Sequence, residues 1–117
     1  MTIKHVFAGI AVTDYDSALA WYTRFFGRPP DVIVTENESM WHGTNTGWIY
    51  VVVDLNRAGK SLLTLLVDDL EDQIAEIKKR GLTTSAIDTV PGLYRKAVMT
   101  DPDGNMISLG QDLSVDA

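Results

Sequence analysis

The sequence contains no cysteine, which excludes disulfide bonds and thiolate chemistry. It also contains no apolar run that approaches the roughly 20 residues needed for a membrane-spanning helix. Its beginning, Met1-Thr2-Ile3-Lys4-His5, lacks the basic and then apolar pattern of a signal peptide. We therefore expect a cytoplasmic protein without a membrane partner.

Basic residues are in the minority, because 10 Lys and Arg stand against 16 Asp and Glu, for a net charge of −6. The cluster Lys78-Lys79-Arg80 falls at the end of a predicted helix, where cations offset the helix dipole. A nucleic-acid partner needs a basic surface, so none is expected. The acidic field favours a neutral or cationic small molecule instead.

What the sequence does have is an internal repeat. A helical pattern begins after Asp14 and ends at Gly27, and a second begins after Asp69 and ends at Gly81. The two Asp residues are 55 positions apart and the two Gly residues 54, and a strand-like apolar run precedes each helix. The 117 residues therefore predict one α+β domain, residues 1–117, built from two βαβββ modules at about 3–55 and 61–112.

The strands expected from apolar and β-branched runs are Val6 to Val12, Val32 to Val34, Ser39 to His42, Trp48 to Val53, Leu62 to Val67, Thr83 to Ile87, Arg95 to Met99 and Met106 to Leu109. The residues expected to face the sheet from the helices are Leu19, Tyr22 and Phe26, then Leu70, Ile74 and Ile77. Because each module has one helix, we expect the helices to cover the outer face of a curled mixed sheet. Its other face is then free to surround a ligand.

The order of these elements, with the turn Asp101-Pro102-Asp103-Gly104-Asn105 before the last strand, resembles the vicinal oxygen chelate superfamily. That superfamily includes glyoxalase I, extradiol dioxygenases, fosfomycin-modifying enzymes and bleomycin-resistance proteins. The resemblance extends from about Val6 to Gln111. It implies a glyoxalase/bleomycin-resistance fold with its functional site on the concave face of the sheet.

In metal-dependent members of that superfamily, the ligands stand on the concave face. The resemblance places the corresponding positions at Phe7, Tyr50, Leu62 and Ser108. Divalent cations need imidazole or carboxylate ligands, and Phe and Leu offer no lone pair. We therefore predict no metal and no other cofactor.

One alternative interpretation of the sequence still allows a metal site. His5 lies two residues before Phe7 on the same strand face, so a slip in register would bring it into a ligand position. His42, Glu36 or Glu38 would then have to complete the site. The second module supplies no matching His or Glu.

Strand alternation predicts a groove of aromatic and apolar side chains on the concave face, with Tyr50 at its centre and Trp41 and Tyr94 near its rim. The predicted ligand-binding residues are Phe7, Gly9, Trp41, Trp48, Tyr50, Leu62, Thr64, Tyr94 and Ser108. The alternative is that these residues fill a core or a dimer interface. No catalytic residue is assigned.

The resemblance and the missing ligands together predict a metal-free binding protein of the bleomycin-resistance type, associated with antibiotic resistance. It would sequester a flat, aromatic or cationic compound. The open sheet faces and the frequency of two-fold dimers predict a homodimer. The alternatives are a glyoxalase-type lyase or dioxygenase with non-standard ligands, a metal-independent enzyme using His5, His42 or Tyr50 as acid or base, and a structural or regulatory module. Fold alone does not choose among them.

Overall fold

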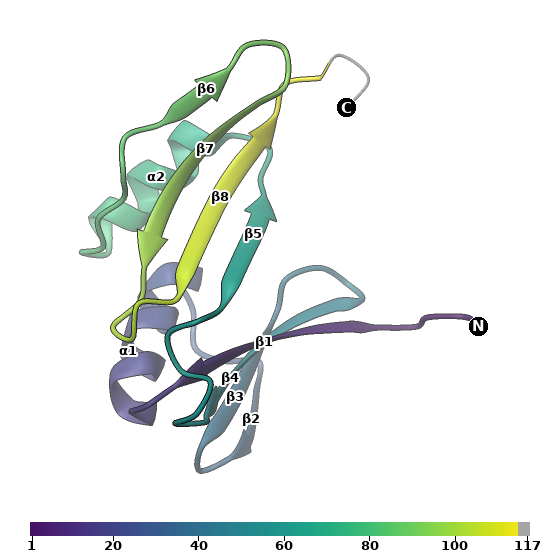
Figure 1. The fold of residues 1–117 in the computed structure, drawn as a ribbon, viewed down its shortest axis with the longest axis vertical. Helices are drawn as coiled ribbons and strands as arrows, with labels where there is room; N and C mark the ends of the chain where they lie inside the picture. The colour runs from purple at the N-terminus through teal and green to yellow at the C-terminus, as the bar shows by residue number, and fades with distance from the viewer. Residues whose placement is uncertain (115–117) are drawn as a thin grey trace.

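The computed structural model describes residues 1–114 and contains two βαβββ modules in succession (Figure 1). The first module consists of β1 (Val6–Val12), α1 (Tyr15–Phe26), β2 (Val32–Thr35), β3 (Glu38–His42) and β4 (Gly47–Val53). The second consists of β5 (Leu62–Leu66), α2 (Leu70–Lys79), β6 (Asp88–Val90), β7 (Tyr94–Thr100) and β8 (Met106–Asp112). The predicted α+β fold with two repeated modules is confirmed.

Each module forms its own four-stranded sheet. The strand orders are β1-β4-β3-β2 and β5-β8-β7-β6, and in each sheet the first pair is parallel while the others are antiparallel. The identical order supports the duplication seen in the sequence. In Figure 1 the second sheet lies above the first, and β5, β7 and β8 run at a steep angle to β1. Within this chain the strands therefore form two mixed sheets, with β1 and β5 at their edges, and not one continuous curled sheet.

Both helices begin and end where the sequence predicts. Asp14 is the N-cap of α1, and Gly27 follows its last turn at φ 74°, a left-handed conformation that glycine adopts without strain. Asp69 is the N-cap of α2, whose buried residues are the expected Leu70, Ile74 and Ile77. Neither helix of the described chain has the length and apolarity to span a membrane.

The buried stripe of α1 differs from the prediction. Its buried residues are Ala18, Tyr22 and Phe25, while Leu19 and Phe26 are only partly covered. The segment from Ala18 to Phe26 is apolar on most of its circumference, so helical spacing alone did not determine which residues face the core.

The strand predicted at Thr83 to Ile87 is also wrong, because β6 lies later, at Asp88–Val90. Within the segment predicted as a strand, Ser85 forms hydrogen bonds to β7. Its backbone N donates to the carbonyl of Val98 at 2.8 Å, and its hydroxyl accepts from the Val98 amide at 2.9 Å. A serine hydroxyl that bonds to the backbone in this way competes with a regular ladder.

The two modules share one hydrophobic core. It is formed by residues of both sheets and both helices: Ile10, Val12, Ala18, Tyr22, Phe25, Trp41, Ile49, Val51, Leu70, Ile74, Ile77, Leu82, Ala97, Met99, Ile107 and Leu109. The helices thus lie on the covered side of their sheets, and the other sheet faces remain more exposed.

Polar contacts from the turn before β8 join the modules. The fully buried side chain of Asn105 donates to the Ala11 carbonyl at 2.8 Å and accepts from the Ser61 amide at 2.9 Å. Asp101 accepts from the Tyr22 hydroxyl at 2.8 Å. Burial and the nearby Asp101 carboxylate raise the pKa of Tyr22 far above its ordinary value, so this hydroxyl remains a donor.

Candidate functional site

The uncovered face of the first sheet carries four of the predicted residues of the first module, Phe7, Gly9, Trp48 and Tyr50. In β4, Ile49 and Val51 are buried against α1, so Trp48 and Tyr50 lie on the opposite face. Phe7 and Gly9 lie on the same face, because their register partners are Trp48 and Tyr50. This surface, opposite α1, corresponds to the face that was predicted to be concave and free of helices. Because it lies away from the core, we call it from here on the outer face of the first sheet.

Three rings on the outer face form a row across β1, β4 and β3. Trp48 is the register partner of both Phe7 and His42. The Phe7 and Trp48 rings are stacked with centroids 6.1 Å apart and planes 6° apart, and the His42 and Trp48 centroids are 3.4 Å apart. Phe7 is nevertheless 52% exposed. This aromatic row, formed by Phe7, Trp48 and His42, thus leaves ring surface available to solvent or a ligand.

Tyr50 lies beside this row and covers Gly9. A methyl group placed on Gly9 would lie 2.5 Å from both Cζ and Oη of Tyr50, which is too close for any real contact. The space next to Gly9, a predicted ligand-binding residue, is therefore occupied by the Tyr50 ring. The ring fits against the backbone there because glycine has no side chain.

The predicted residues of the second module lie on the other sheet. Leu62 pairs with Met106, and Thr64 pairs with Ser108, on the face opposite the buried Ile107 and Leu109. Leu62 is 81% exposed. The nine predicted site residues are thus divided between two sheets of this chain.

The structure corrects the expectation for Trp41, which lies in the core and not at a rim. Its side chain has no exposed surface, its ring stacks on Phe26 at 5.1 Å, and its Nε1 donates to the Arg28 carbonyl at 3.0 Å. Tyr94 is on the surface at the start of β7, where the Lys96 ammonium lies 5.6 Å from its ring centroid.

The four positions that correspond to metal ligands do not suit a divalent cation. Phe7 and Leu62 have no donor atom, and Tyr50 and Ser108 offer only hydroxyl groups. The ring of His42, a candidate for an alternative site, packs against Trp48 at an interplanar angle of 33°. Residues 1–114 contain no group of three or more His, Cys, Asp or Glu side chains placed to hold a metal ion.

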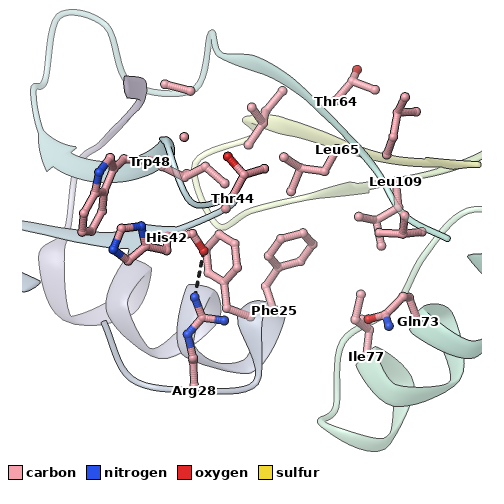
Figure 2. A pocket seen from close by; sticks show the side chains of 18 of the residues that line it. Phe25, Arg28, His42, Thr44, Trp48, Thr64, Leu65, Gln73, Ile77 and Leu109 are labelled. Carbon is pink, nitrogen blue, oxygen red and sulfur yellow. Dashed lines mark hydrogen bonds between the residues drawn. The ribbon is translucent and has the colours of Figure 1, made fainter. Parts of the chain in front are cut away.

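A cavity of about 530 Å³ lies between the two modules (Figure 2). It is bounded by the end of α1, by one side of α2, by β5 and by the β3-β4 turn. Of the nine predicted residues, it brings together Trp48 and Thr64. The sequence analysis did not find this cavity, because its walls come from segments far apart in the chain and carry no shared motif.

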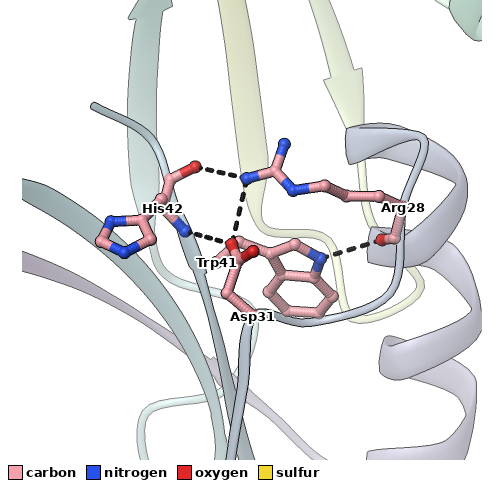
Figure 3. Close-up of polar contacts among 4 residues, drawn as sticks. All are labelled: Arg28, Asp31, Trp41 and His42. Carbon is pink, nitrogen blue, oxygen red and sulfur yellow. Dashed lines mark hydrogen bonds and ion pairs between the residues drawn. The ribbon is translucent and has the colours of Figure 1, made fainter. Parts of the chain in front are cut away.

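A polar cluster joins this cavity to the aromatic row (Figure 3). Arg28 Nη2 donates to the His42 carbonyl at 2.8 Å and to Asp31 Oδ2 at 3.1 Å, and the same Asp31 oxygen accepts from the His42 amide at 2.7 Å. The bond from the His42 amide, followed by the one from Arg28, lowers the pKa of Asp31. These bonds fix the backbone of His42, whose ring is part of the row.

The sequence profile of the Glyoxalase/Bleomycin resistance protein/Dioxygenase superfamily matches residues 2–109. The chain belongs to this superfamily. The resemblance inferred from the duplicated modules and the turn before β8 is therefore confirmed. No curated protein matches the chain significantly.

Solved structures of this superfamily share the fold. A glyoxalase/bleomycin resistance protein from Catenulispora acidiphila DSM 44928 is 34% identical with a TM-score of 0.87, over 92% of this chain and 96% of that chain. TnmS3, an antibiotic binding protein from Streptomyces sp. CB03234, is 26% identical with a TM-score of 0.75, over 96% and 98% of the two chains. Lactoylglutathione lyase from Agrobacterium tumefaciens, at 17% identity with a TM-score of 0.70 over 91% of each chain, is similar in fold alone.

Proposed function

We propose that this superfamily member is a metal-free protein that binds a flat organic compound on the aromatic row of its first sheet. The observation that carries the proposal is the contact of the Phe7, Trp48 and His42 rings in one register across three strands, with Phe7 stacked on Trp48 and half-exposed. Planar ligands gain contact area on such a surface. The similarity to TnmS3, which is an antibiotic binding protein, supports a ligand of antibiotic type.

The site is completed by a second copy of the chain. Both β1 and β5 are edge strands, and they carry the exposed apolar residues Val6 and Phe7, and Leu62 and Leu66. Exposed apolar edge strands favour pairing with another chain. If β1 meets β5 of a second copy, the aromatic row lies beside the outer face of that copy's second sheet. Two-fold symmetry then produces two such sites in the dimer.

Trp48 offers a direct test. Proflavine, a planar cation, and anthraquinone-2-sulfonate, a planar anion, would be titrated against the wild type and the Trp48→Leu variant by calorimetry. We expect proflavine to bind more tightly than the anion, because the chain is acidic. We also expect Trp48→Leu to weaken the binding of proflavine about tenfold, in line with the 0.5 to 1.5 kcal/mol of an aromatic contact.

Trp21→Leu is the matched control. Trp21 is also a partly buried tryptophan, but it lies on α1 and stacks on Phe25, away from the row. The Trp21→Leu variant should bind proflavine with the same affinity as the wild type. Failure of both dyes to bind, or equal losses in the two variants, would rule out a site on the row.

The hydroxyl of Tyr50 is expected to orient the ligand. Tyr50→Phe keeps the ring over Gly9, so the free energy of unfolding should change by less than about 1 kcal/mol. Affinity for a bound dye should fall by the roughly 0.5 to 1.5 kcal/mol of one hydrogen bond. An unchanged affinity would show that the hydroxyl does not contact the ligand.

The absence of a metal is tested separately. Elemental analysis after exposure to Zn²⁺, Ni²⁺ and Mn²⁺ should find far less than one ion per chain, because the ligand positions hold Phe7, Tyr50, Leu62 and Ser108. Tight binding of one of these ions that is lost in His5→Ala would instead support a slipped register that includes His5.

A further inference from the structure

The cavity between the modules differs in charge from the molecule as a whole. The chain has a net charge of −6, yet none of the described residues that line the cavity is Asp or Glu. Two of the lining residues, Arg28 and Arg80, are cationic. The lining is therefore opposite in sign to the rest of the chain.

Arg80 supplies a charge that no carboxylate among the described residues offsets. Its Nη2 donates to the Phe25 carbonyl at 3.0 Å, and its Nε donates to the Arg24 carbonyl. These carbonyls belong to the end of α1, whose partial charge is only about half an elementary charge. Within residues 1–114, Arg80 takes part in no ion pair, whereas Arg28 is paired with Asp31 at 3.1 Å. A net positive charge thus remains at Arg80.

The remaining walls of the cavity are mainly apolar. Phe25 and Phe26 come from α1, Leu63 and Leu65 from β5, and Ile77 from α2. Figure 2 shows Phe25 and Arg28 on one side of the space and Gln73 and Ile77 on the other. The volume of about 530 Å³ lies within the roughly 300 to 1,000 Å³ that is common for small-molecule sites.

We propose that this cavity binds a small organic anion with an apolar body, such as an aromatic or aliphatic carboxylate. The anionic group bonds to the guanidinium of Arg80, and the body packs against Phe25, Phe26 and Leu65. Charge-assisted bonds of this kind are about twice as strong as neutral ones. The site shares only the edge residues His42 and Trp48 with the aromatic row, and its ligand has the opposite charge from the one expected there.

The test uses three ligands that differ only in their polar group: 4-phenylbutyrate, 4-phenylbutanol and 4-phenylbutylamine. Each is titrated into ¹⁵N-labelled full-length protein while amide chemical shifts are recorded. We expect 4-phenylbutyrate to shift the resonances of Gln73, Ile77 and Arg80, and to bind about tenfold more tightly than the alcohol. The amine should bind more weakly than either.

Gln73→Glu provides a variant of nearly the same shape that adds a negative charge to the cavity wall. Gln73 is exposed on α2, so the fold should not be affected. The variant should bind 4-phenylbutyrate at least about fivefold more weakly and 4-phenylbutanol as before. Asn56→Asp adds the same charge in the exposed segment between β4 and β5, outside the cavity lining, and should change neither affinity.

Several results would overturn the proposal. One is equal affinity for the acid and the alcohol, and another is a shift confined to Phe7 and Tyr50 on the outer face. A third is the absence of any shift up to about 10 mM ligand, which would mean negligible affinity. If the Gln73 resonances move with protein concentration instead, a second copy fills the cavity and the proposal is wrong. Trp48→Leu tests the aromatic row with the dyes, and Gln73→Glu tests the α2 wall of the cavity with 4-phenylbutyrate. Failure of the cavity proposal is therefore distinguishable from failure of the proposed function.

Discussion

Individual polar residues hold the two modules in their arrangement, and Asn105 is the best example. Its side chain is fully buried and bonds to the Ala11 carbonyl, the Ser61 amide and the Asp101 carboxylate. A residue that satisfies groups from both modules explains why the turn before β8 carries such a specific sequence. The Asp pair in that turn, Asp101 and Asp103, thus serves structure: Asp103 accepts two bonds from Thr13 of the first module, at 3.1 and 2.6 Å.

Asn105→Ala should therefore strongly destabilise the protein. It leaves buried donors and acceptors without partners, and each such loss costs about 1 to 3 kcal/mol. We expect a decrease of roughly 3 kcal/mol in the free energy of unfolding, measured by urea denaturation. Asn45→Ala, in the exposed β3-β4 turn, is the control and should change it by less than about 0.5 kcal/mol. A loss of similar size in both variants would contradict this role of Asn105.

Asp31 should make stability depend on pH. Its pKa lies below the usual value of 3.8 because the ionised carboxylate accepts bonds from His42 and Arg28. A lowered pKa in the folded state means that ionisation stabilises the fold above the unfolded-state pKa. This contribution is lost as the pH falls through the lower, folded-state value.

The measurement is the unfolding free energy of wild type and Asp31→Asn from about pH 5 to about pH 2. The wild type should be more stable at the upper end, and the difference between the proteins should shrink below pH 3.8. A difference that stays constant over this range would show that the Asp31 carboxylate is not stabilised by ionisation.

At the scale of elements, each helix is followed by a glycine with a left-handed backbone conformation, and the one after α1 lies beside Arg80 in the cavity wall. Gly27 follows α1 at φ 74°, and Gly81 follows α2 at φ 89°. A side chain in this left-handed region costs roughly 1 to 2 kcal/mol. A methyl group on Gly27 would also lie 3.0 Å from the guanidinium carbon of Arg80, while one on Gly81 would meet nothing within 4 Å.

These two glycines form a matched pair for substitution. Both Gly27→Ala and Gly81→Ala should lower the free energy of unfolding by about 1 kcal/mol or more, because of the shared backbone strain. Gly27→Ala should lower the free energy of unfolding more than Gly81→Ala does, since the new methyl group also crowds Arg80. Thermal or urea denaturation would compare them. Equal losses would indicate that Arg80 moves aside without cost.

At the scale of the whole molecule, the two sheets leave apolar edge strands uncovered in a single chain. Leu62 on β5 and Leu55 between β4 and β5 are both highly exposed leucines, at 81% and 71%, but only Leu62 lies on an edge strand. A charged side chain on an edge strand opposes pairing with another chain. The two leucines thus allow the proposed dimer to be tested with a variant and its control.

Sedimentation velocity at micromolar concentration should show wild-type protein at twice the chain mass of 12.9 kDa. Leu62→Lys should shift the protein toward the monomer, and Leu55→Lys should leave the dimer intact. A monomeric wild type would contradict the predicted homodimer.

The sequence by itself determined the features that depend on neighbouring residues. The repeat, the start of the helices after Asp14 and Asp69 and the alternation along β4 were all predicted correctly, because helix starts and strand periodicity are local. The duplicated order of elements, together with the turn before β8, indicated the superfamily. The same local information did not determine which side of α1 is buried, since most sides of that helix are apolar.

Only the tertiary structure decided how the modules meet. Trp41 is buried in the structure. The sequence did not predict this burial, because Ser39-Met40-Trp41-His42 has no clear apolar alternation that would show which face points to the core. The tertiary structure also placed Tyr50 over Gly9, and it brought Arg80 from one module to the end of α1 in the other. The cavity exists only because the two modules are held at a particular orientation. Contacts between residues more than fifty positions apart fix that orientation, and no local pattern encodes them.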